Sequence, residues 1–66
     1  MELTVNGVGR RVSAAITLAD LVSEMIPESR GVAVAVNGEV VPRVGWAART
    51  LRDGDRVEVL TAAQGG

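Results

Sequence analysis

The residues best suited to chemistry lie at the end of the sequence, where Gln64 precedes Gly65 and Gly66. A carboxylate on Gly66 would be reached through small residues, because glycine has no Cβ and passes where a larger side chain would collide. A carboxylate is also a poor electrophile, so a second protein would have to activate it. Gln64, Gly65 and Gly66 are therefore the candidate residues for chemistry at a chain end that enters a partner, with the Gly66 carboxylate as the group that would need activation.

The amino-acid composition offers few other reactive groups. The 66 residues include no cysteine and no histidine, which excludes disulfides, thiolate metal sites and a cysteine nucleophile. It also removes the commonest general base and metal ligand. None of the seven cationic residues is a lysine, so no side-chain amine could attack an activated chain end. We predict a protein that is not an enzyme and has no catalytic site of its own, with no metal and no cofactor bound by this chain.

The net charge and the hydropathy of the sequence limit the kinds of partner and the cellular location that we expect. The net charge is −1 and tryptophan is the single aromatic residue, which gives neither a basic footprint nor a stacking platform for nucleic acid. No apolar run approaches the roughly 20 residues of a membrane span, and the first residues lack the regions of a signal peptide. We expect a cytoplasmic protein that is a monomer when free and binds neither nucleic acid nor membrane.

The first half of the chain predicts two strands and a helix. Residues 2–6 alternate polar and apolar, as a half-buried strand does, and Asn6-Gly7 is a turn signal, with Gly9 close behind as part of the same turn region. A short antiparallel strand over 10–13, with Val12 facing inward, would follow. The helix begins after Thr17, which forms a capping-box pattern with Asp20.

The predicted helix has one apolar face, and the residues around it fix its ends. Ile16 and Leu21 occupy the two positions of a hydrophobic staple. Pro27 would stop the helix. The apolar residues of its buried face fall at i, i+3, i+4 and i+7: Leu18, Leu21, Val22 and Met25.

The second half predicts three more strands. Val32 to Val36 is apolar, and Asn37-Gly38 is the strongest short hairpin signal available, a two-residue type I′ turn. The return strand would cover 39–41 and end at Pro42. Residues 43–51 show no clear period and could hold a helical turn around Trp46. After a turn at 53–55, residues 56–60 alternate again.

The order of these elements predicts an α+β domain over residues 1–60, with a flexible tail over 61–66. One helix covers one face of a mixed sheet of four to five strands. The first and last strands would lie side by side and parallel, because the connection between them crosses over through the helix. The last strand then lies centrally in the sheet.

These residues resemble the ThiS family, the sulfur carrier proteins of thiamine biosynthesis. The resemblance spans nearly the whole chain. It implies a ubiquitin-like β-grasp fold. One departure is visible, because family members often have glycine just before the helix where this chain has Ala14-Ala15. The resemblance is carried by the segments LTVNG (3–7), TLADL (17–21), GVAVAVNGEVVPR (31–43), WA (46–47), LRDGDRVEV (51–59) and GG (65–66).

The resemblance also implies a reaction cycle and its partners. An adenylating, E1-like enzyme would use ATP to activate the Gly66 carboxylate. A sulfur relay from a cysteine desulfurase would replace the AMP and leave a thiocarboxylate on Gly66. Thiazole synthase would then take this sulfur for the thiazole ring.

Two alternatives remain open at this point. Sulfur carriers for molybdopterin synthesis have a similar fold and tail. TGS domains, which are binding modules without covalent chemistry, share Asn37-Gly38, Pro42 and the pattern of residues 54–59. The shared residues are turn and strand signals, so they report the fold and not the function.

Docking residues are harder to assign from the sequence. Leu60 alternates out of phase with Val57 and Val59, so it would either dock partners from the open sheet face or be semi-buried. Arg52 and Arg56 could pair with acidic groups of a partner, although scattered arginines are usually just solvated. We expect Trp46 to be a packing residue.

Overall fold

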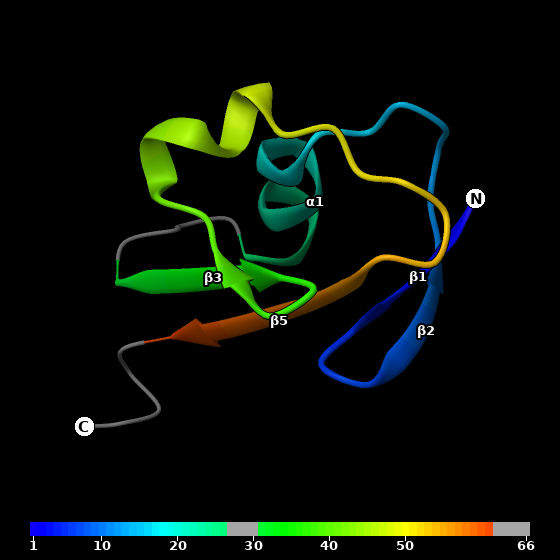
Figure 1. Ribbon diagram of the computed structural model, residues 1–66, viewed down its shortest axis with the longest axis horizontal. Coiled ribbons are helices and arrows are strands. Elements are labelled where there is room, and N and C mark those ends of the chain that lie inside the picture. Colours follow the sequence, from blue (N-terminus) through cyan, green and yellow to red (C-terminus); the bar gives the residue numbers. More distant parts are fainter. Residues whose placement is uncertain (27–30, 62–66) are drawn as a thin grey trace.

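The computed structural model describes residues 1–26 and 31–61, and in these residues one helix lies against one face of a mixed sheet (Figure 1). This arrangement confirms the predicted α+β class. The strand order across the sheet is β2-β1-β5-β3-β4. The elements are β1 (Glu2–Val5), β2 (Val8–Arg11), α1 (Leu18–Met25), β3 (Val32–Val36), β4 (Glu39–Val40), a 3₁₀ helix (Arg43–Ala48) and β5 (Arg56–Thr61).

β5 lies in the middle of the sheet, as predicted. Its first residues pair in parallel with β1, where Thr4 is opposite Arg56 and Val5 is opposite Val57. Its residues from Val57 to Thr61 pair antiparallel with β3. The strand that leads to the end of the chain is therefore bounded by a strand on each side.

The second strand differs from the prediction over 10–13. It covers Val8–Arg11, and Val5 is directly opposite Val8. Asn6 and Gly7 have φ values of 52° and 83°, so the chain reverses over two residues and pairing resumes at once. Gly9 is not part of the turn, contrary to the prediction, because it pairs with Thr4 within the strand. Val12 follows the strand and is half-buried against the core, as expected.

The helix begins as the capping box predicts. The Thr17 hydroxyl accepts a hydrogen bond from the Asp20 N–H at 3.1 Å, and the Asp20 carboxylate accepts one from the Thr17 N–H at 3.4 Å. The helix ends at Met25 with Ile26 as its C-cap. The predicted stop at Pro27 lies outside the described residues.

A single apolar core lies between α1 and the sheet. Trp46 is 5% exposed and its indole N–H donates to the Val41 carbonyl at 2.8 Å, which confirms that it is a packing residue. It comes from the 3₁₀ helix, whose three-residue turn explains why the segment showed no helical or strand period. The buried apolar residues are Leu3, Val5, Ile16, Leu18, Leu21, Val22, Val34, Val36, Val41, Trp46, Leu51, Val57 and Val59.

Candidate functional site

The predicted tail residues Gln64, Gly65 and Gly66 lie outside the described residues. The structure therefore describes the surface around the strand that leads into this tail. β5 ends at Thr61, one residue beyond the predicted strand.

The side of β5 that faces away from α1 is exposed. Val57 and Val59 are buried, whereas Leu60 is 66% exposed, so Leu60 occupies the open face of the sheet rather than a semi-buried position. Ala33 is opposite Leu60 in the antiparallel pair. A shallow groove on this face is lined by Ala33, Val34, Ala35, Val40, Glu58 and Leu60.

The predicted docking arginines lie at the other end of β5. Arg56 is the first residue of the strand and is exposed. It is on the same face as Leu60, and four residues of strand separate the two by about 13 Å. Arg52 is exposed in the loop that precedes β5. The structure thus brings Arg52 and Arg56 to one end of the central strand and Leu60 to the other.

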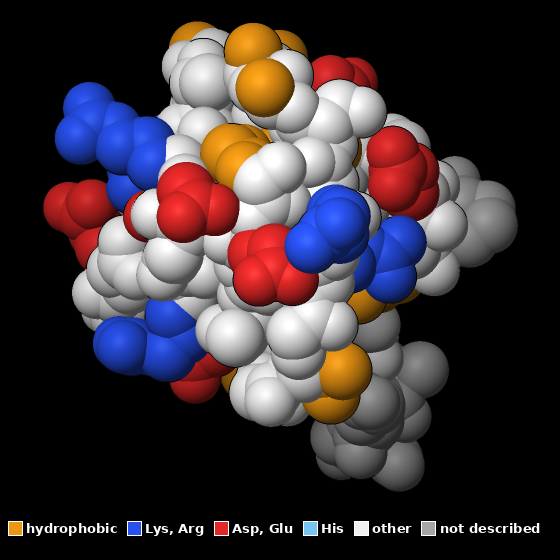
Figure 2. All heavy atoms as spheres, turned by 90° about the vertical axis from the view of Figure 1, so that its right-hand side faces the viewer, with side chains coloured by type: hydrophobic (Ala, Val, Ile, Leu, Met, Phe, Trp, Pro, Cys, Tyr) orange, Lys and Arg blue, Asp and Glu red, His pale blue; other side chains and the backbone are white. Residues whose placement is uncertain are grey.

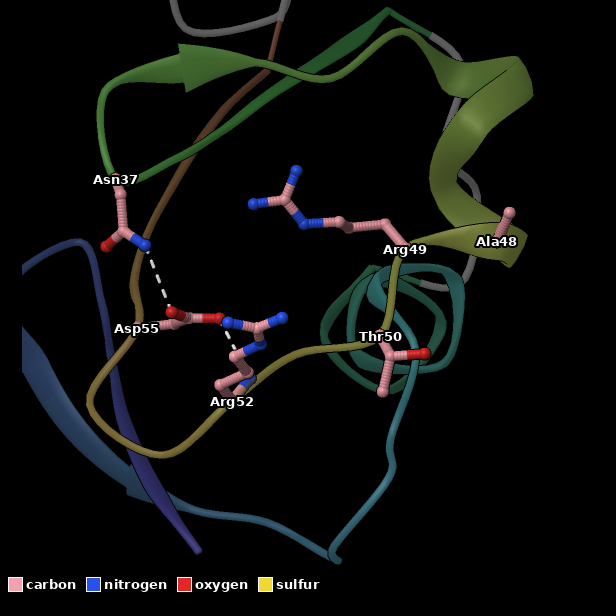
Figure 3. A pocket seen from close by; sticks show the side chains of 6 residues that line it. All are labelled: Asn37, Ala48, Arg49, Thr50, Arg52 and Asp55. Atoms are coloured by element: carbon pink, nitrogen blue, oxygen red, sulfur yellow. Dashed lines mark hydrogen bonds between the residues drawn. The ribbon is translucent and has the colours of Figure 1, made fainter.

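A polar pocket of about 450 Å³ lies between the turn after β3 and the loop before β5 (Figure 3). The Arg49 side chain extends into it from one side, and Asn37 and Asp55 line the other side, with Arg52 next to Asp55. An Arg49 guanidinium nitrogen is 3.7 Å from a Glu39 carboxylate oxygen. The sequence analysis did not single out Arg49, because its place depends on the tertiary arrangement of the loop.

Charges on the described surface are mixed. Figure 2 shows cationic and acidic side chains interspersed on one face of the molecule, without a large patch of either sign. Two ion pairs at 3.5 and 3.6 Å join Arg11 to Glu2 and Arg10 to Glu24. Exposed pairs such as these contribute little stability.

Two asparagine side chains bind β5, and the sequence analysis missed both contacts. The Asn6 Oδ1 accepts from the Val59 N–H at 2.8 Å, and its Nδ2 donates to the Val59 carbonyl at 3.1 Å. The Asn37 Oδ1 accepts from the Arg56 N–H at 2.9 Å, and its Nδ2 donates to an Asp55 carboxylate oxygen at 3.0 Å. The repeated Asn-Gly pair is the one sequence signal that could have pointed to them.

The described part of the chain contains no buried charged side chain and no group of three or more possible metal-ligating residues. None of its helices is long and apolar enough to cross a membrane. The features that stand out are an exposed sheet face, a polar pocket and a central strand held at both ends.

The model of the ThiS family matches residues 3–66. The chain belongs to the ThiS family. The crystal structure of a ThiS from Geobacter metallireducens superimposes with a TM-score of 0.84, at 38% identity, over 92% of this chain and 93% of that one. This similarity confirms the ubiquitin-like β-grasp fold that the family resemblance implied.

Two curated relatives of this ThiS-family chain bear on its role. The sulfur carrier protein ThiS of Escherichia coli K12 is 29% identical over the full length of both chains. The thiazole synthase of Paramagnetospirillum magneticum is 39% identical over all 66 residues, but this chain spans only 20% of its length. These findings support the predicted sulfur carrier in thiamine biosynthesis, a carrier rather than an enzyme. They favour it over a molybdopterin carrier or a TGS module.

Proposed function

We propose that this ThiS-family chain carries sulfur as a thiocarboxylate on Gly66, formed after ATP-dependent adenylation, and donates it for thiazole formation. The observation that carries the proposal is the family match, which runs through Gly65 and Gly66. The central position of β5 supports it, because a partner can draw on the residues after Thr61 while the strand before them stays paired with β3.

The chemistry needs an activated terminus and a partner that encloses it. The negative charge of a carboxylate repels nucleophiles, so the partner would form a mixed anhydride between Gly66 and AMP, with release of pyrophosphate from ATP. A persulfide of the cysteine desulfurase relay would then displace AMP from the acyl carbon and form an acyl disulfide, and a thiol would cleave its S–S bond to leave the thiocarboxylate and a new disulfide. Gly65 and Gly66 suit such a channel because neither carries a Cβ. ATP is used by the E1-like partner, and this chain binds no cofactor in the proposed cycle.

Thiazole synthase is the proposed acceptor of the sulfur. A protein named thiazole synthase contains a segment similar to the whole of this chain, which supports an association between the two activities. The E1-like enzyme and the desulfurase relay are the partners proposed for activation and for sulfur delivery.

Intact-protein mass spectrometry tests the covalent step. The chain is incubated with ATP, the adenylating partner and a sulfur source. We expect a mass gain equal to the replacement of one oxygen by sulfur, mapped by fragmentation to Gly66. A variant without Gly65 and Gly66 is the control and should gain no mass. Sulfur on another residue, or full function in cells after this deletion, would contradict the proposal.

Rescue experiments separate the two sulfur pathways. We expect the gene to restore growth of a thiamine auxotroph that lacks its own carrier. We expect no restoration of molybdenum-enzyme activity in a strain that lacks the molybdopterin carrier. The opposite pattern would assign the chain to the second pathway.

We also propose that Leu60, Arg52 and Arg56 contact the partners. Leu60→Ser should weaken binding to the adenylating enzyme without changing stability, because the side chain is 66% exposed. Val44→Ser is a matched control, since Val44 is 94% exposed on the 3₁₀ helix. For the arginines, Arg52→Gln and Arg56→Gln are compared with Arg11→Gln, whose side chain is 83% exposed on β2. Equal affinities for target and control variants in calorimetric titrations would remove these residues from the interface.

A further inference from the structure

Val59 lies on β5 beyond the end of its parallel neighbour. The Asn6 N–H donates to the Val57 carbonyl at 2.9 Å, which shows that the main-chain groups of Val57 face β1. Along a strand, main-chain groups two residues apart point to the same edge. The N–H and carbonyl of Val59 therefore also face the β1 side, where β3 cannot reach them, although β1 itself ends at Val5.

Asn6 completes this ladder with its side chain. Its main chain has turned into the hairpin, with φ at 52°. The carboxamide takes the place of the next rung, because Oδ1 accepts from the Val59 N–H at 2.8 Å and Nδ2 donates to the Val59 carbonyl at 3.1 Å. Unpaired main-chain groups are costly in a partly buried position. One side chain thus satisfies both main-chain groups of a residue that lies 53 positions away.

We propose that Asn6 is a positioning residue for the carrier tail. Its carboxamide holds the β1 side of β5 at Val59 while β3 pairs with the other side as far as Thr61, so that a partner draws only on the residues after Thr61. This inference rests on the proposed function, in which Gly66 enters the partner's active site.

Loss of the Asn6 contacts should change how the carrier binds and not how it reacts. Without Asn6, the residues from Val59 to Thr61 are held by β3 alone and leave the sheet more often. Each residue that leaves adds up to ~3.5 Å of slack and must be ordered again when the tail enters the channel, which costs conformational entropy. The bound terminus still reaches the same place. We therefore expect the KM for the carrier to rise and kcat to stay unchanged.

The alternative is that Asn6 is needed only for the backbone conformation of the turn between β1 and β2. Asparagine is favoured at positive φ, and Asn37 has the same φ of 52° before a glycine with the same φ of 83°. Asn37 contacts β5 at Arg56, at the end remote from the tail. Asn6→Gly and Asn37→Gly therefore form a matched pair, because each keeps a permissive backbone and removes one carboxamide.

The experiment compares both variants in the full chain. Hydrogen exchange reports the Val59 amide, and steady-state adenylation by the partner gives KM and kcat. For Asn6→Gly we expect Val59 to exchange about 10-fold faster than the change in global stability explains. We also expect a KM about 3- to 10-fold higher with unchanged kcat. Asn37→Gly should change neither quantity beyond its effect on global stability. Asn6→Asp keeps the acceptor oxygen and loses the donor, so its KM should fall between wild type and Asn6→Gly.

Two results would overturn the inference. One is a KM for Asn6→Gly equal to that of the wild type, and the other is the same rise in KM for both glycine variants. Absence of any adenylate on Gly66 in the wild-type chain would instead overturn the proposed function, and the role of Asn6 with it. The intact mass of the wild-type adduct distinguishes these cases.

Discussion

The two Asn-Gly hairpins share a turn geometry but hold different ends of the central strand. Both asparagines have φ at 52° and both glycines have φ at 83°. The turn between β1 and β2 places the Asn6 carboxamide on the main chain of Val59, whereas the turn between β3 and β4 places the Asn37 carboxamide on Arg56 and Asp55. The comparison teaches that one short sequence pattern secures both a parallel and an antiparallel ladder, because the side chain adds a rung where the main chain turns away.

Alanine at the first turn position should have the largest effect. Asn6→Ala removes two hydrogen bonds and puts a Cβ into the left-handed region, so we expect the free energy of unfolding to fall by about 2–3 kcal/mol. For Asn37→Ala we expect the free energy of unfolding to fall by about 1.5–2.5 kcal/mol for the same reasons. Urea unfolding followed by circular dichroism measures both. A loss below about 0.5 kcal/mol in either variant would contradict the role of the turn.

Glycine at the same positions isolates the side-chain contacts. We expect Asn6→Gly to lower the free energy of unfolding by about 1–2 kcal/mol, because it leaves both main-chain groups of Val59 without their partner. Asn37→Gly should cost about 0.5–1 kcal/mol, since its contacts are exposed and water can replace them. The same unfolding measurement applies. Equal losses, or a larger loss at Asn37, would show that burial does not distinguish the two hairpins.

Double-mutant cycles should detect an energetic coupling with Asp55 for Asn37 but not for Asn6. Asp55 accepts from Asn37 Nδ2 at 3.0 Å and from the Arg52 N–H at 2.8 Å. We expect a coupling of about 0.5–1 kcal/mol between Asn37→Gly and Asp55→Ala. The control cycle pairs Asn6→Gly with Asp55→Ala and should give no coupling beyond about 0.3 kcal/mol. Coupling of equal size in both cycles would indicate that β5 transmits the changes along its length.

A substitution in the loop before the helix should have the smallest effect, and it should raise the free energy of unfolding rather than lower it. Ala15 has φ at 65°, the left-handed region that glycine occupies without strain, and this loop is where the ThiS resemblance led us to expect glycine. Ala15→Gly should raise the free energy of unfolding by about 0.5–1 kcal/mol. Ala14→Gly is the control and should lower it slightly, since Ala14 is not among the residues with positive φ. A loss of stability in Ala15→Gly would contradict this account.

Local signals in the sequence were sufficient for most of the fold. The capping box at Thr17 fixed the helix start because its two hydrogen bonds involve residues three apart. The crossover through the helix placed β1 beside β5, since a parallel pair requires such a connection. The start of β2 was predicted two residues too late, because Gly9 looked like part of the turn when the type I′ turn needs only two residues.

The candidate site was less accessible to sequence reasoning. The exposure of Leu60 was one of two alternatives until the neighbouring strands were placed. The contacts of Asn6 with Val59 and of Asn37 with Arg56 join residues far apart in the chain. No periodicity reports such contacts, because they arise only when the sheet is assembled. The tail residues that carry the proposed chemistry were identified from sequence alone, and they lie outside the described residues.

The parallel pairing of β1 with β5 also bears on how the domain folds. The first strand of the domain has the last strand as its neighbour, and Asn6 contacts Val59 across 53 positions. Such distant contacts slow folding, since the conformational entropy of the intervening chain is lost before they form. The two hairpins and the helix can therefore form early from local contacts, whereas the core is complete only when β5 brings Val57 and Val59 between the other strands.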